Sequence, residues 1–146
     1  MQKIIYILIC FTILISSVVA EEIFLSLKKS KVNVRYGPSL ESDIKYVYKK
    51  INLPIKQIDK KENFRRIIDL KNNSGWIHIS QLKKNTSVIT TKDKILFKKP
   101  SSFAKPMAQI KEGRLLIIQK CEENWCKIKT NDYAGWIKNN DIWGFN

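Results

Sequence analysis

Short apolar stretches separated by polar turns recur along the chain from residue 23 to residue 145. The clearest alternation is in residues 32–36 (VNVRY), whose valines and tyrosine share one face while the asparagine and arginine share the other. A period of two is typical of a half-buried β-strand. Gly37 and Pro38 follow at once, and they favour a bend because Gly permits positive φ and Pro fixes φ. The pattern therefore predicts a strand that ends in a turn.

Similar runs predict further short strands on both sides of the middle of the chain. They cover residues 23–27, 53–58, 64–70, 75–79, 94–97, 115–120 and 125–130. The segment 44–51 (IKYVYKKI) fits either a strand or a short amphipathic helix. About five short strands in about sixty residues, with no long helical period, are typical of a small β-barrel. The predicted fold class is all-β.

The pattern occurs twice. Gly75-Trp76-Ile77 returns as Gly135-Trp136-Ile137, and residues 34–39 (VRYGPS) align with residues 96–101 (LFKKPS). A repeat of this kind indicates one structural unit used twice. The predicted domains are residues 21–84 and 85–146, with the polar run 83–87 (KKNTS) as a linker. Units of this size are marginal alone, so we expect the two to lean on each other.

Residues 1–20 have the pattern of a secretory signal peptide. Lys3 is followed by an apolar run, and small residues (SSVVA) precede Glu21 at the usual cleavage spacing. The alternative is an uncleaved membrane anchor, although residues 4–20 are at the short limit for crossing a bilayer. We expect cleavage, no membrane span afterwards, and a periplasmic or secreted mature chain.

The chain is strongly basic, with a formal net charge of +14 that falls to +13 when Lys3 is removed. Such a surface attracts acidic partners in a salt-dependent way. The charge is spread over both units and includes no Arg/Lys-rich strand face with stacking aromatics. With the signal peptide, this argues against nucleic acid as a partner. Electrostatic association with acidic surfaces remains an expectation.

The opening motif resembles that of bacterial SH3-like domains, which reads approximately Leu-Asn-Val-Arg-x-Gly-Pro-Ser. The residues that carry the resemblance are Asn33, Val34, Arg35, Gly37 and Pro38, followed by the closing Gly75-Trp76. In the second unit Gly135-Trp136 is kept but the opening motif is degenerate, which is similar to paired SH3-like domains of exported alphaproteobacterial proteins. The resemblance implies two tandem five-stranded barrels outside the cytoplasm. It also implies non-catalytic binding, often to cell-wall peptides or envelope proteins.

Four residues of the first unit form the predicted ligand-binding surface. Arg35, Tyr36, Tyr46 and Tyr48 are aromatics and a cation near one Gly-Pro loop, a combination that suits a shallow groove for a peptide or glycan. The tryptophans of both units are expected in the barrel wall and core, with ligand platforms as the alternative.

Two cysteines remain after cleavage, Cys121 and Cys126, and they flank a predicted hairpin turn. Directly opposed residues in a hairpin lie within disulfide range, and an exported chain meets oxidising conditions. We therefore expect a disulfide, with a pair of reduced thiols as the alternative. His78 is the single histidine and the carboxylates are scattered, so the sequence predicts no catalytic site, no metal site and no cofactor.

These observations favour an exported, non-catalytic binding module. The expected partner is peptidoglycan or an envelope protein. The alternative is a periplasmic or secreted protein–protein adaptor that uses the basic surface. An enzyme of wall hydrolysis is not favoured, because the sequence offers no catalytic constellation.

Overall fold

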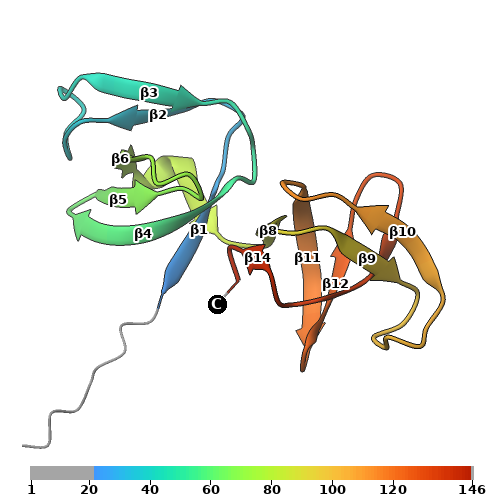
Figure 1. Ribbon diagram of the computed structural model, residues 1–146. Helices are drawn as coiled ribbons and strands as arrows, with labels where there is room; N and C mark the ends of the chain where they lie inside the picture. Colours follow the sequence, from blue (N-terminus) through green and yellow to red (C-terminus); the bar gives the residue numbers. More distant parts are fainter. Residues whose placement is uncertain (1–21, 146) are drawn as a thin grey trace, which may run out of the picture.

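A computed structural model describes residues 22–145, so the predicted signal peptide lies outside the described residues. The chain forms two β-sheets in succession, which we name the first unit and the second unit (Figure 1). The first unit contains β1 (Ile23–Leu27), β2 (Val32–Arg35), β3 (Ile44–Tyr48), β4 (Pro54–Lys61), β5 (Phe64–Ile68), β6 (Ser74–His78), the 3-10 helix η1 (Ile79–Gln81) and β7 (Leu82–Lys84). The second unit contains β8 (Ser87–Thr90), β9 (Lys94–Phe97), β10 (Pro106–Ile110), β11 (Leu115–Glu122), β12 (Trp125–Lys129), β13 (Ala134–Lys138) and β14 (Ile142–Trp143).

The two sheets have the same topology. Strand order is β3-β2-β6-β5-β4-β1-β7 in the first unit and β10-β9-β13-β12-β11-β8-β14 in the second, so each strand has a counterpart seven places later. The all-β prediction is confirmed, and the segment 44–51 resolves to strand β3 rather than a helix. The expected number of strands was too low: each unit has seven. Strands as short as β7 and β14 have too few residues to show a period in the sequence.

The repeated Gly-Trp-Ile motif has a packing explanation. A Cβ on Gly75 would lie 2.3 Å from Cγ1 of Val34, and a Cβ on Gly135 would lie 2.7 Å from the carbonyl oxygen of Phe97. In both units the glycine thus lets the sixth strand approach the second. The tryptophan that follows faces the other side: Trp136 is buried and Trp76 is half-buried.

Each unit has its own apolar core, and two positions differ between them. In the first unit Leu27 and Val32 are fully buried. Their counterparts by strand register are Thr90 and Lys94, which are buried polar residues of the second unit. Burial lowers the pKa of Lys94, although its ammonium donates to Oδ1 of Asn140 at 3.1 Å.

A small polar joint connects the two units. Residues 83–87 were expected to be a linker, but Lys83 and Lys84 belong to β7 and Ser87 belongs to β8. The Asn85 side chain accepts from Oγ of Ser26 and donates to the carbonyl oxygen of Gly144 at 2.5 Å. These contacts satisfy buried polar groups, which is why the linker is ordered.

Apolar contact adds to this joint. Trp143 of β14 meets Phe24 of β1 edge to face, with ring centroids 5.0 Å apart. A further hydrogen bond crosses the same joint, because the Ser87 hydroxyl donates to the carbonyl oxygen of Asn52 at 2.5 Å. The last strand of the second unit therefore packs on the first unit, as expected for two small units that stabilise each other.

Candidate functional site

The structure divides the four predicted binding residues into two pairs. Tyr46 and Tyr48 project from the same face of β3, with hydroxyl oxygens 3.3 Å apart and ring centroids 5.2 Å apart. Both pack against the core of the first unit. Burial raises the pKa of each tyrosine, so both phenols stay neutral. These two residues support the fold as much as they offer a surface.

Tyr48 is also connected to the turn between β5 and β6. The hydroxyl of Tyr48 donates to Oδ2 of Asp69 at 3.0 Å. Oδ1 of Asp69 accepts from the backbone N–H groups of Lys71 and Asn73, each at 2.9 Å. The buried carboxylate thus joins β3 to the turn and keeps it in one conformation.

Tyr36 begins the β2–β3 loop, which we define as residues 36–43, and Arg35 is the last residue of β2 before it. The guanidinium of Arg35 donates to the carbonyl oxygen of Ser42 at 2.7 Å and so holds the loop against β2. Tyr36 is 66% exposed, and the ammonium of Lys45 lies 5.6 Å from the centre of its ring. Leu40 on the same loop is also exposed. This loop presents an ordered aromatic and apolar surface to solvent.

The remaining motif residues of the first unit are structural. Val34 is fully buried, and the backbone N–H of Asn33 donates to Oε1 of Gln81 at 3.3 Å. A Cβ on Gly37 would lie 2.7 Å from Oγ of Ser42, so a side chain at the start of the loop, which continues through Pro38, would require the Ser42 hydroxyl to move. The motif that is readable in the sequence therefore shapes the loop.

The place in the second unit that corresponds to Tyr46 and Tyr48 is open. In the β9–β10 pair, Ala108 occupies the position of Tyr46 and Ile110 occupies that of Tyr48. With the two rings gone, a groove of about 920 Å³ opens beside β10 and β11. Its apolar lining includes Leu96, Ala108, Ile110, Leu116 and Tyr133. We call it the β10–β11 groove.

Charged residues surround this groove. Lys50 comes from the first unit, whereas Lys111, Arg114, Lys129 and Asp132 come from the second. Among residues 22–145, Lys50, Arg114 and Lys129 take part in no ion pair. The groove therefore combines an apolar floor with an excess of positive charge, a composition common in ligand sites. Sequence reasoning missed it.

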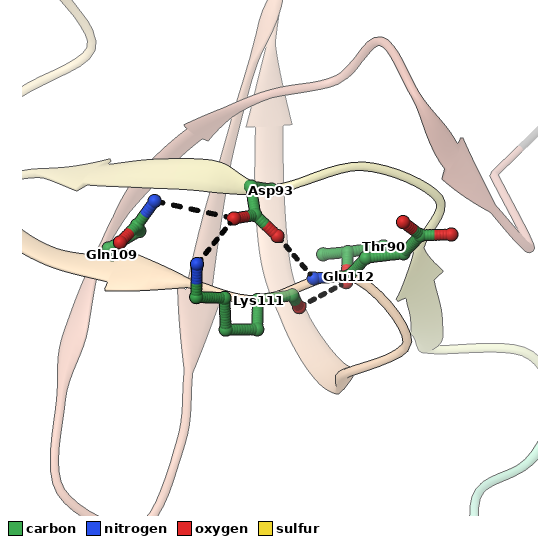
Figure 2. A network of polar contacts seen from close by, with 5 residues as sticks. All are labelled: Thr90, Asp93, Gln109, Lys111 and Glu112. Atoms are coloured by element: carbon green, nitrogen blue, oxygen red, sulfur yellow. Dashed lines mark hydrogen bonds and ion pairs between the residues drawn. The ribbon is translucent and has the colours of Figure 1, made fainter.

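One wall of the groove is fixed by a polar network (Figure 2). The Asp93 carboxylate accepts from the ammonium of Lys111 at 2.7 Å, from the side chain of Gln109 and from the backbone N–H of Glu112. The hydrogen bond from Lys111, with that from Glu112, lowers the pKa of Asp93. The Thr90 hydroxyl accepts from the backbone N–H of Arg114 and donates to the carbonyl oxygen of Lys111. The turn that follows β10 is thus tied to the ends of β8 and β9.

The loop between β9 and β10 is the counterpart of the β2–β3 loop, with different chemistry. Phe103 at its tip is fully exposed, at 101%. Lys98, Lys99 and Lys105 lie around it and line a shallow hollow with it. No acidic residue lies between positions 98 and 105, whereas the β2–β3 loop holds Glu41 and Asp43.

The cysteine prediction is confirmed. Cys121 and Cys126 are directly opposed in the β11–β12 hairpin and form a disulfide, with Cα atoms 4.0 Å apart. His78 stacks edge to face on Phe64 and accepts from the backbone N–H of Ser80 at 3.3 Å, so its ring caps η1. Across residues 22–145, no three His, Cys, Asp or Glu residues gather as metal ligands do.

The family model for the bacterial SH3 domain matches the chain twice, over residues 28–84 and 92–144. The chain therefore belongs to the bacterial SH3 domain family, and its architecture is two tandem SH3-like β-barrels. No curated protein is similar enough to the chain to count as a match. Within residues 22–145, no helix has the length and apolar character needed to cross a membrane.

Several solved structures are similar to the chain at low identity. NlpC1 from Trichomonas vaginalis is 12% identical, with a TM-score of 0.40 over 87% of this chain and 47% of its own. An NlpC/P60 family protein from Bacillus cereus ATCC 10987 is 14% identical, with a TM-score of 0.38 over 82% of this chain and 55% of its own. The chain thus spans about half the length of the solved structures that it matches.

Proposed function

We propose that the protein is an exported, non-catalytic module that binds the cell wall, through peptidoglycan or an envelope component attached to it. The observation that carries this proposal is the ordered, exposed surface of the β2–β3 loop around Tyr36. An aromatic ring held in place before binding loses little conformational freedom when a ligand stacks on it. Membership of the bacterial SH3 domain family and the N-terminal signal pattern support the same reading.

The chemistry of this surface suits a wall fragment. The exposed face of Tyr36 can stack on the apolar faces of sugar rings or on peptide side chains. The neighbouring Lys45 is anchored by a hydrogen bond to the carbonyl oxygen of Ser74 at 2.9 Å, and it offers a positive charge to carboxylates. Arg35 contributes indirectly by fixing the loop through Ser42.

The experiment is a pulldown of the mature chain, residues 21–146, on insoluble peptidoglycan at low and high salt. We expect retention that persists at about 0.5 M salt, because screening removes a purely electrostatic contact but not stacking. Tyr36→Ala is expected to lose most of the retention. Phe103→Ala is the matched control, since it removes an exposed aromatic ring from the counterpart loop of the second unit.

Two outcomes would overturn the proposal. Retention that is lost at high salt would leave charge as the attraction and would favour the alternative, a periplasmic or secreted protein–protein adaptor with a basic surface. Equal retention of the Tyr36→Ala variant, the Phe103→Ala control and the wild type would remove the β2–β3 loop from the binding site.

A further inference from the structure

We propose that the β10–β11 groove is a second binding site, and that it takes an extended, acidic protein segment with apolar side chains. This inference goes beyond wall binding and does not depend on it. It rests on the contrast between two equivalent places in one chain. The first unit fills this place with Tyr46 and Tyr48, whereas the second unit leaves it open through Ala108 and Ile110.

The size of the groove and its lining favour a short peptide. A volume of about 920 Å³ lies in the range of sites that bury a small ligand or a few side chains. Leu96 and Leu116 form an apolar floor, and Tyr133 stands half-exposed at the β12–β13 turn. Such a floor accepts aliphatic side chains that would otherwise face water.

Charge selects the kind of peptide. The three rim cations Lys50, Arg114 and Lys129 are exposed and free of ion pairs within residues 22–145, against the single carboxylate of Asp132. Lys111 is already neutralised by Asp93. The electrostatic complement of this rim is a segment that carries several carboxylates.

The strand order favours an extended conformation. β10 is an end strand of its sheet and pairs only with β9, so its other edge has backbone groups outside the ladder. A free edge is where an extended peptide gains main-chain hydrogen bonds, while pockets beside it take alternate side chains. The Asp93 network holds the end of β10 in place, so the edge is formed before binding (Figure 2).

Lys50 gives the site a contribution from the other unit. Lys50, Ile51 and Asn52 belong to the β3–β4 connection of the first unit, yet they line the groove of the second. The joint at Ser87, which donates to the carbonyl oxygen of Asn52, keeps that connection next to β8. The complete rim therefore exists only in the tandem arrangement.

The test is a nuclear magnetic resonance titration of the isotope-labelled mature chain with a short synthetic peptide of alternating leucine and glutamate. We expect amide shifts centred on residues 108–110 and 130–133. Two further peptides, one with lysine for glutamate and one with serine for leucine, are expected to bind at least about ten-fold more weakly. Equal binding of either control peptide would overturn the stated ligand chemistry.

Ala108→Tyr is the decisive variant, because it restores the ring that the first unit has at this place. We expect it to weaken binding of the leucine–glutamate peptide by about ten-fold or more. Ser102→Tyr adds the same side chain on the exposed β9–β10 loop and is expected to bind like the wild type. Unchanged binding by Ala108→Tyr would overturn the site.

A second variant keeps the test valid if Ala108→Tyr folds poorly. Lys129→Glu reverses one rim charge at an exposed position and is expected to reduce affinity about five-fold and to weaken its salt dependence. No effect of this change, or no binding of the acidic peptide to the wild type, would overturn the proposal. So would groove shifts caused only by soluble peptidoglycan fragments. Tyr36→Ala should leave peptide binding intact, which separates this site from wall binding.

Discussion

The two units share a strand order but differ in how they close the space beside their end strand. In the first unit Tyr46 and Tyr48 cover the core and connect to Asp69, so the surface is filled and rigid. In the second unit Ala108 and Ile110 leave that space open, and a disulfide stabilises the neighbouring hairpin. One copy of the barrel thus keeps a packed face while the other has room for a ligand.

Among the variants that test this comparison, Tyr48→Ala is expected to change the free energy of unfolding most. Loss of a large ring packed on the core is expected to destabilise the first unit by about 3 kcal/mol. Tyr48→Phe keeps the ring and loses only the hydroxyl, with its contacts to Asp69 and Tyr46, so we expect the free energy of unfolding to fall by about 1 kcal/mol. Denaturant unfolding measures both. Equal costs for the two variants would show that the ring is not what closes this face.

The next effect concerns the disulfide and should be confined to the second unit. Replacing both Cys121 and Cys126 by serine is expected to cost about 2 kcal/mol, because the bond restricts a short loop of the unfolded chain. The counterparts in the first unit are the opposed residues Lys60 and Arg65, which hold no such crosslink. Hydrogen exchange followed by mass spectrometry should show lost protection in β11 and β12. Equal loss in β4 and β5 would contradict this separation.

The smallest expected effect is on the pH dependence of stability, which should differ between the two units at alkaline pH. The raised pKa of Tyr48 means that its stabilising contribution is present below about pH 10 and is lost as the pH rises further, since the unfolded chain releases the phenolic proton first. The contribution of Lys94 to stability changes with pH in the opposite direction. Its pKa is lowered, so the cost of burying its charge disappears as the pH rises toward about 10.4.

Unfolding free energies measured through this range test the divergence. Tyr48→Phe should flatten the alkaline loss of stability, and Lys94→Met should remove the alkaline gain. Tyrosinate absorbance identifies the phenol that ionises on unfolding. Identical pH profiles for the wild type and both variants would show that neither buried group governs the response.

The sequence predicted what depends on local chemistry. Gly75 and Gly135 are visible as a repeat because a Cβ at either place would collide with the neighbouring strand. The disulfide was predictable because a short turn places its two cysteines directly opposite each other. The strands β7 and β14 were missed, because a run of two or three residues carries no measurable period. The strands β8 and β10 were also absent from the prediction.

The binding surfaces were harder to predict. Arg35 and Tyr36 were grouped with Tyr46 and Tyr48 because they are close in sequence, but the first pair shapes an exposed loop while the second covers the core. The groove was not predicted, because it arises where the second unit has smaller side chains than the first. The β-bulges of β2–β3 and β9–β10 lie at equivalent places, so Ala108 aligns with Tyr46 at the offset that already relates residues 34–39 to residues 96–101. What the sequence does not show is that the space beside these positions stays open in the second unit.

The joint at Asn85 and Gly144 has a consequence for the order of assembly. Chains emerge from the ribosome with their N-terminal residues first, and domains generally fold as they emerge. The first unit can close once β7 is available, but its contacts with Trp143 and Gly144 must wait until the end of the second unit has appeared. During that interval Phe24 lacks its aromatic neighbour, so the first unit reaches its final packing only after the second unit has been synthesised.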